Sequence, residues 1–103
     1  MLLSSLKKVL NHELSFTHFK EEISDEVANY KKLLGKKGAN IPIHVREDID
    51  LLFIDINQLL EATRTGHLDK YESSYIADAL TLSESFKNFN DQDAYLIESL
   101  ILS

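Results

Sequence analysis

The stretch HVREDIDLLFIDINQLLEATRT, residues 44–65, is the longest and most apolar patterned segment of this 103-residue chain. Apolar or weakly polar residues recur in it at spacings of three and four, the period of one helix face. They are Val45, Ile49, Leu52, Phe53, Ile56, Leu59, Leu60 and Thr63. Acids take many of the other positions. We therefore predict a helix over residues 44–65 that forms the centre of the fold, with Phe53 in the core.

Four further segments show helical periodicity, at residues 2–14, 16–34, 70–81 and 91–102. Three glycines and one proline are few for a chain of this length, which favours long helices over short strands with tight turns. The sequence therefore predicts an all-α fold, a compact bundle of about five amphipathic helices. Residues 82–89 are predicted to connect the last two helices and to fold Phe86 and Phe89 back over the core.

Several residue types mark the expected helix ends. Serine, aspartate and asparagine cap the first turn of a helix through their side-chain oxygens, and glycine ends a helix in a left-handed conformation. The predicted markers are Ser15 or Thr17, Asp69 with Glu72 as a capping box, and Asn90 or Asp91 at helix starts, and Gly35 and Gly66 at helix ends.

The length of the chain predicts a single helical domain over residues 1–103. The absence of cysteine excludes disulfides, thiolate nucleophiles and cysteine-based zinc sites. Lys7 and Lys8 follow the first apolar residues instead of preceding them, unlike a secretory signal peptide. No apolar run approaches the ~20 residues that span a bilayer. We expect a cytoplasmic protein with no membrane contact.

Charge is distributed unevenly along the chain, whose net charge is −6. Residues 1–45 hold seven lysines and five acids, whereas residues 46–103 hold four basic residues and twelve acids, a net charge of −8. This acidic part repels phosphate backbones and disfavours nucleic-acid binding. It favours a basic protein as partner, although a need for solubility also accounts for it.

The sequence contains no catalytic or metal-binding pattern. The four histidines are scattered without i, i+4 pairs, so we expect no metal and no cofactor. His44 and Asp48 lie one turn apart, as an oriented general base would, but a helix-start or surface pair explains the spacing better. Residues 88–99 lack the glycine and the final glutamate of a calcium loop. Asp48, Asp50 and Asp55 spread around the predicted helix instead of converging. We therefore expect a protein that is not an enzyme.

Two segments near the C-terminus share a pattern. YIADALTLS, residues 75–83, aligns with YLIESLILS, residues 95–103. Two copies do not establish a repeat protein, which generally needs three. The pattern does predict similar environments for Tyr75 and Tyr95, each with a buried ring and a hydroxyl near the rim.

A small, acidic, helical domain fits an inhibitor of a basic protein. A nuclease toxin is basic around its active site because it holds nucleic acid, and an acidic protein can cover that surface with aromatic anchors. The residues predicted to contact the partner lie in the acidic part of the chain. They are Asp48, Asp55, Asp69, Tyr71, Glu72, Tyr75, Asp78, Glu84, Phe86, Asp91 and Asp93.

The stretch LDKYESSYIADALTLS, residues 68–83, with the aromatic and acidic connector after it, resembles small helical immunity proteins of bacterial contact-dependent inhibition and other polymorphic toxin systems. The resemblance implies a protein that binds and blocks one cognate toxin and has no catalytic residues. The alternative is a non-enzymatic helical adaptor or regulatory subunit that binds a partner through an apolar groove. Nucleic-acid binding would have to use the lysines of the N-terminal third, where no recognition helix is visible.

Overall fold

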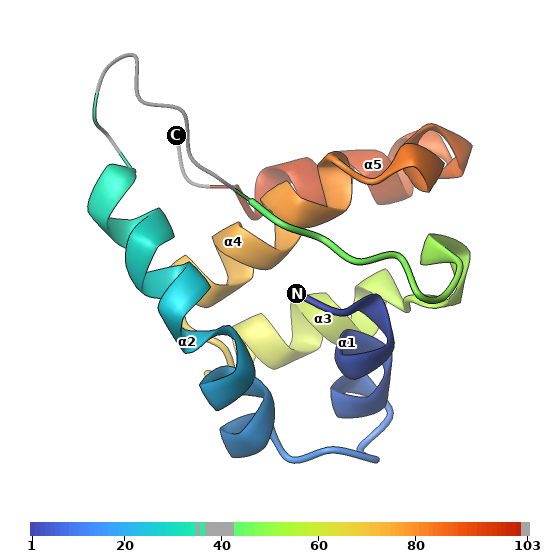
Figure 1. Ribbon diagram of the computed structural model, residues 1–103. Coiled ribbons are helices and arrows are strands. Elements are labelled where there is room, and N and C mark those ends of the chain that lie inside the picture. Colours follow the sequence, from blue (N-terminus) through green and yellow to red (C-terminus); the bar gives the residue numbers. More distant parts are fainter. Residues whose placement is uncertain (35, 37–42, 102–103) are drawn as a thin grey trace.

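The computed structural model describes residues 1–34, 36 and 43–101, and over these residues the fold is an all-α bundle of five helices (Figure 1). They are α1 (Leu3–Leu10), α2 (Phe16–Leu33), α3 (Ile56–Arg64), α4 (Lys70–Thr81) and α5 (Asp91–Ser99). Two short 3-10 helices, η1 (Leu51–Phe53) and η2 (Glu84–Asn88), precede α3 and α5. The predicted fold class is confirmed, and no helix in the described part of the chain is long and apolar enough to cross a bilayer.

The helix predicted over residues 44–65 is wrong in its first half, because residues 43–50 form no helix and instead hold a β-bridge at Arg46 and a bend at residues 48–49. The backbone of Arg46 pairs with the start of the chain: its N–H donates to the Met1 carbonyl at 2.8 Å, and its carbonyl accepts from the Leu3 N–H at 3.1 Å. These long-range bonds satisfy backbone groups that a helix would have paired locally. The segment therefore fastens the N-terminus to the bundle.

Two aspartates divide the rest of the predicted helix into separate turns. The Asp50 side chain accepts a hydrogen bond from the Leu52 N–H at 2.9 Å and starts η1. The Asp55 side chain accepts from the N–H groups of Asn57 and Gln58 in the first turn of α3. Such caps compete with continuation of a helix. As a result Phe53 is 63% exposed, and its predicted place in the core is wrong.

Helix α4, rather than the 44–65 segment, occupies the centre of the bundle, where it packs against α2, α3 and α5 (Figure 1). Residues 72–77 are all buried. Two small serines let the neighbouring helices approach, and their hydroxyls are paired across helix boundaries. The Ser73 hydroxyl lies 2.7 Å from that of Thr63 in α3, and the Ser74 hydroxyl lies 2.7 Å from that of Tyr30 in α2. These buried hydrogen bonds tie α4 to both neighbours.

The helix predicted over residues 2–14 ends early, because α1 stops at Leu10. His12 adopts a left-handed conformation, with φ of 63°. The N–H groups of His12 and Glu13 bond to the carbonyls of Val9 and Lys8 at 3.2 and 2.8 Å. This is the Schellman pattern of a helix end, formed here around a histidine instead of the usual glycine. It turns the chain toward the start of α2.

Most predicted helix-end markers are confirmed. A side chain caps each of three helices, and one glycine ends another at a φ of 83°. The markers are Ser15 before α2, Gly66 after α3, Asp69 with Glu72 as a capping box at α4, and Asn90 before α5. Gly35 lies outside the described residues. Local side-chain chemistry thus marks these boundaries in the sequence.

The C-terminal region differs from the expectation in two respects. Tyr75 is 1% exposed, whereas Tyr95 is 70% exposed, so their predicted similar environments are wrong. Ile97 supplies the fully buried side chain of α5 instead. Helix α5 ends at Ser99, short of the predicted residue 102, which lies outside the described residues. Phe86 and Phe89 do pack against the core, as predicted, with their rings edge to face.

Candidate functional site

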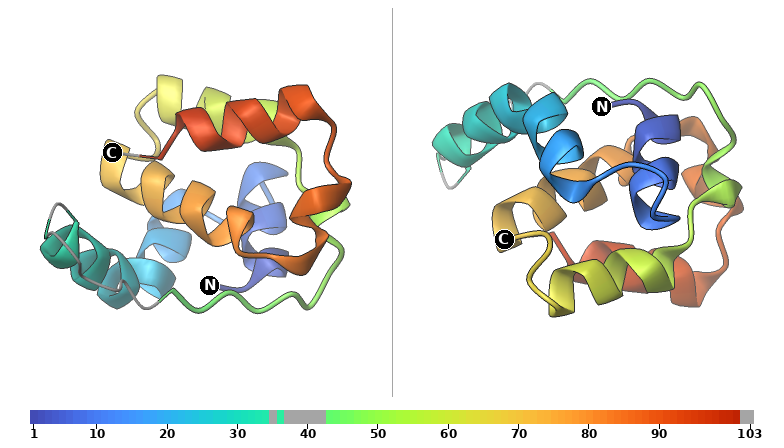
Figure 2. Two further views of the ribbon diagram at one scale, coloured as in Figure 1. Left: turned by 90° about the horizontal axis from the view of Figure 1, so that it is seen from above. Right: turned by 90° about the horizontal axis from the view of Figure 1, so that it is seen from below.

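The first candidate surface lies where η1 and η2 meet. Figure 2 shows that α3 and α5 both begin on this side of the bundle. The two segments touch directly, because the Glu84 N–H donates to the Glu47 carboxylate at 3.4 Å. Seven acids lie in or next to η1, η2 and the starts of α3 and α5, and they are called the acidic end below: Glu47, Asp48, Asp50, Asp55, Glu84, Asp91 and Asp93. The same segments contain just two basic residues, Arg46 and Lys87, so this end is strongly negative.

Large apolar side chains stand exposed at the acidic end. Leu52 and Phe53 in η1 are 53% and 63% exposed, and Leu82, next to η2, is 59% exposed. The Lys7 ammonium lies 4.9 Å from the centroid of the Phe53 ring, a cation–π contact that orients the ring. Exposed apolar groups flanked by charge are the usual anatomy of a protein docking surface.

The carboxylates of the acidic end divide into two groups. Asp50 and Asp55 cap helices, and Asp48 accepts hydrogen bonds from the hydroxyl and the N–H of Ser4. The bond from the Ser4 hydroxyl is the main cause that lowers the pKa of Asp48. Glu84 and Asp91 form no side-chain hydrogen bond or ion pair with residues that the structure describes. These two carboxylates can therefore meet a partner without the loss of a structural bond.

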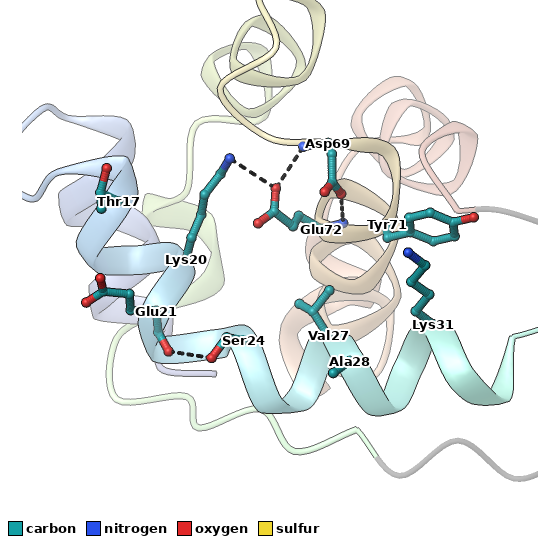
Figure 3. A pocket seen from close by; sticks show the side chains of 10 residues that line it. All are labelled: Thr17, Lys20, Glu21, Ser24, Val27, Ala28, Lys31, Asp69, Tyr71 and Glu72. Atoms are coloured by element: carbon teal, nitrogen blue, oxygen red, sulfur yellow. Dashed lines mark hydrogen bonds and ion pairs between the residues drawn. The ribbon is translucent and has the colours of Figure 1, made fainter.

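The second candidate surface is a groove of about 480 Å³ between α2 and the start of α4 (Figure 3). Val27, Ala28 and the ring of Tyr71 form its apolar part. Two ammonium groups lie over the same ring: Lys31 of α2 at 4.8 Å and Lys70 of α4 at 5.1 Å from the centroid. Neither lysine has an ion-pair partner in the described part of the chain. Of the two, Lys31 lines the groove, so this end of the groove carries one unpaired cation, with Lys70 close by outside the lining.

The two acids that line the groove at the start of α4 are electrostatically satisfied. Asp69 and Glu72 each accept a hydrogen bond from the other's N–H at 2.8 Å, and the Lys20 ammonium lies 3.4 Å from the Glu72 carboxylate (Figure 3). Glu72 is only 9% exposed. These two acids, predicted to contact a partner, hold the start of α4 in place.

The structure separates the predicted partner-binding residues. Six lie at the acidic end, namely Asp48, Asp55, Glu84, Phe86, Asp91 and Asp93, and three line the groove, namely Asp69, Tyr71 and Glu72. Tyr75 packs in the core with its ring against that of Tyr30, so its prediction as a contact residue is wrong. Burial raises the pKa of Tyr75, and the nearby Glu26 carboxylate adds to the rise. Asp78 is half-buried on α4, and desolvation raises its pKa.

The sequence prediction missed the exposed apolar residues Leu52 and Phe53 because it assigned them to a buried helix face. A signal was present: Asp55 and Gln58 have the spacing of a capping box at a helix start. The groove was also missed, because its residues come from two helices whose packing the sequence does not reveal.

The fold and these two surfaces define a small all-α protein with candidate docking sites. Among the described residues, no group of three or more histidine, aspartate or glutamate side chains could hold a metal ion. No protein-family model, curated protein or solved structure matches the chain. The arguments about function below therefore rest on the geometry and charge of this molecule.

Proposed function

We propose that this protein is a bacterial immunity protein that acts in the cytoplasm and neutralises a cognate toxin, a nuclease, by covering its basic active-site surface. It acts as a binding protein and not as an enzyme. The observation that carries the proposal is the acidic end, where η1 with exposed Leu52 and Phe53 meets η2 with the unpaired Glu84, and Asp91 follows at the start of α5.

The acidic end has the two properties that such a complex needs. Its negative field attracts a basic surface and raises the rate of encounter, an effect that salt weakens because the Debye length is about 8 Å at physiological ionic strength. Its exposed apolar side chains lose contact with water in the complex and slow dissociation. Since a nuclease needs its basic surface for substrate, occupation of that surface blocks activity without chemistry.

The test requires a candidate toxin, which a neighbouring gene for a protein with a basic toxic domain would supply. Co-expression should restore growth, and titration calorimetry should show direct binding that weakens with salt. The double charge reversal Glu84→Lys with Asp91→Lys should weaken binding roughly 10- to 100-fold at low salt, about 1.4–2.8 kcal/mol. The matched control is Glu13→Lys with Asp25→Lys, which makes the same charge change at exposed residues of the N-terminal half.

The control pair should bind within about twofold of wild type at high salt, where long-range effects are screened. At low salt the control pair should lose less affinity than the Glu84, Asp91 pair; equal losses there would show that net charge, and not the acidic end, determines affinity. Growth restored without a direct complex would exclude neutralisation by occlusion. Circular dichroism of both pairs checks that the bundle is intact, since Asp91 also lies in the first turn of α5.

A second candidate function is a non-enzymatic adaptor or regulatory subunit. The groove between α2 and α4 favours it, because an open apolar groove on a helical bundle is suited to binding a segment of another protein. The two functions use different surfaces, so variants at the acidic end and in the groove separate them.

A further inference from the structure

We infer that the groove between α2 and α4 docks an amphipathic helix of a partner protein, with carboxylates at one end of that helix. The inference rests on the second candidate function, that the groove docks a partner, and it names the chemistry of the occupant. It does not depend on the acidic end.

The shape of the groove favours a helix over a compact small molecule. Its α2 wall runs from Thr17 to Lys31, which at 1.5 Å per residue is roughly 20 Å. The α4 wall comes from the first turn of that helix alone, so the groove is long and open on one side. A helix of about 14 residues matches this length. Drug-sized ligands, by contrast, are usually enclosed by their pockets.

The surface chemistry of the α2 wall also suits a helix with an apolar face. Ser24 and Ala28 are small and exposed, so another backbone can approach α2 closely between them. The Ser24 hydroxyl donates to the Glu21 carbonyl at 3.0 Å and therefore needs no partner from an incoming chain. Val27 and the ring of Tyr71 provide apolar surface at the middle and basic end of the groove (Figure 3).

The charges define the orientation of the occupant. Lys31 lines the groove at its basic end, and Lys70, outside the lining, lies over the same Tyr71 ring. Neither has an acidic partner among the described residues, so incoming carboxylates gain charge-assisted hydrogen bonds there. At the other end Glu72 is already paired with Lys20 and leaves no free cation for a second acid. The carboxylate-bearing end of the partner helix therefore lies over Lys31 and Lys70.

The probe is a displayed library of 14-residue helical peptides, selected for binding to the wild-type protein. Selection should enrich peptides with apolar residues at spacings of three and four and with Asp or Glu at one end. An enriched peptide should lose at least tenfold in affinity to the Lys31→Glu, Lys70→Glu double variant. Ala28→Trp, which fills the groove from an exposed position, should reduce its binding to a similar degree.

The matched control is Lys8→Glu with Lys87→Glu, the same charge change at exposed lysines outside the groove, and it should leave binding within twofold. Enrichment of no common pattern, or of basic peptides, would overturn the inference. So would enriched peptides that bind the groove variants as tightly as wild type. None of these results bears on toxin binding, which Glu84 and Asp91 test separately.

Discussion

A comparison of Phe53→Ala with Leu59→Ala tests whether residues 44–65 form one helix. Both positions belong to the same apolar period in the sequence, so a continuous helix would bury both side chains, and the larger phenylalanine would cost more to remove. In the structure Leu59 is fully buried in α3, whereas Phe53 is 63% exposed in η1. The structure therefore predicts the opposite order of stability losses.

The expected magnitudes follow from burial. Leu59→Ala should cost about 2–5 kcal/mol, the range for a buried leucine. Full burial of a phenylalanine contributes roughly 1.5–3 kcal/mol, so the buried third of Phe53 contributes about 0.5–1 kcal/mol. The contact with the Lys7 ammonium adds about 0.5–1 kcal/mol at an exposed site. Phe53→Ala should thus cost about 1–2 kcal/mol.

Urea denaturation followed by circular dichroism measures both losses as shifts of the midpoint, provided that the slope of the unfolding free energy with urea stays constant. The Lys7→Met variant in a double-mutant cycle with Phe53→Ala isolates the cation–π contact. A loss of 3 kcal/mol or more for Phe53→Ala, or a loss larger than that of Leu59→Ala, would refute the exposed placement of η1.

Two further predictions concern α4. Asp69→Ala removes the N-cap and should lower the unfolding free energy by about 0.5–2 kcal/mol in thermal or urea denaturation; an unchanged stability would mean that the capping box is unimportant. Burial raises the pKa of Asp78 in the folded protein above 3.8, its value in the unfolded chain. The folded state therefore holds the proton more tightly, and the wild-type protein loses stability as the pH rises from the unfolded pKa through the folded pKa. Asp78→Asn lacks this loss, and its stability relative to wild type should increase as the pH rises above the unfolded value of 3.8; a pH-independent difference would contradict the burial of this carboxyl.

Local signals in the sequence determined the helical class and many helix ends. The capping box of Asp69 with Glu72 and the left-handed Gly66 after α3 involve residues close together in sequence. Such local signals can be recognised without knowledge of the tertiary fold. The periodicity of residues 70–81 also predicted α4 with its exact bounds, because that pattern meets no competing cap inside it. The net charge of the second half is likewise a property of composition alone.

Tertiary structure alone decided where the centre of the molecule lies and which residues share a surface. The apolar period of residues 44–65 would suit one continuous helix, but the tertiary structure interrupts it. The Arg46 backbone forms long-range hydrogen bonds with the start of the chain, and the Asp55 side chain accepts hydrogen bonds that begin a new helix. The acidic end exists because η1 meets η2, and the groove exists because α2 meets α4. Contacts between segments far apart in sequence carry no local signal, because their energy depends on packing that forms only when the whole chain folds.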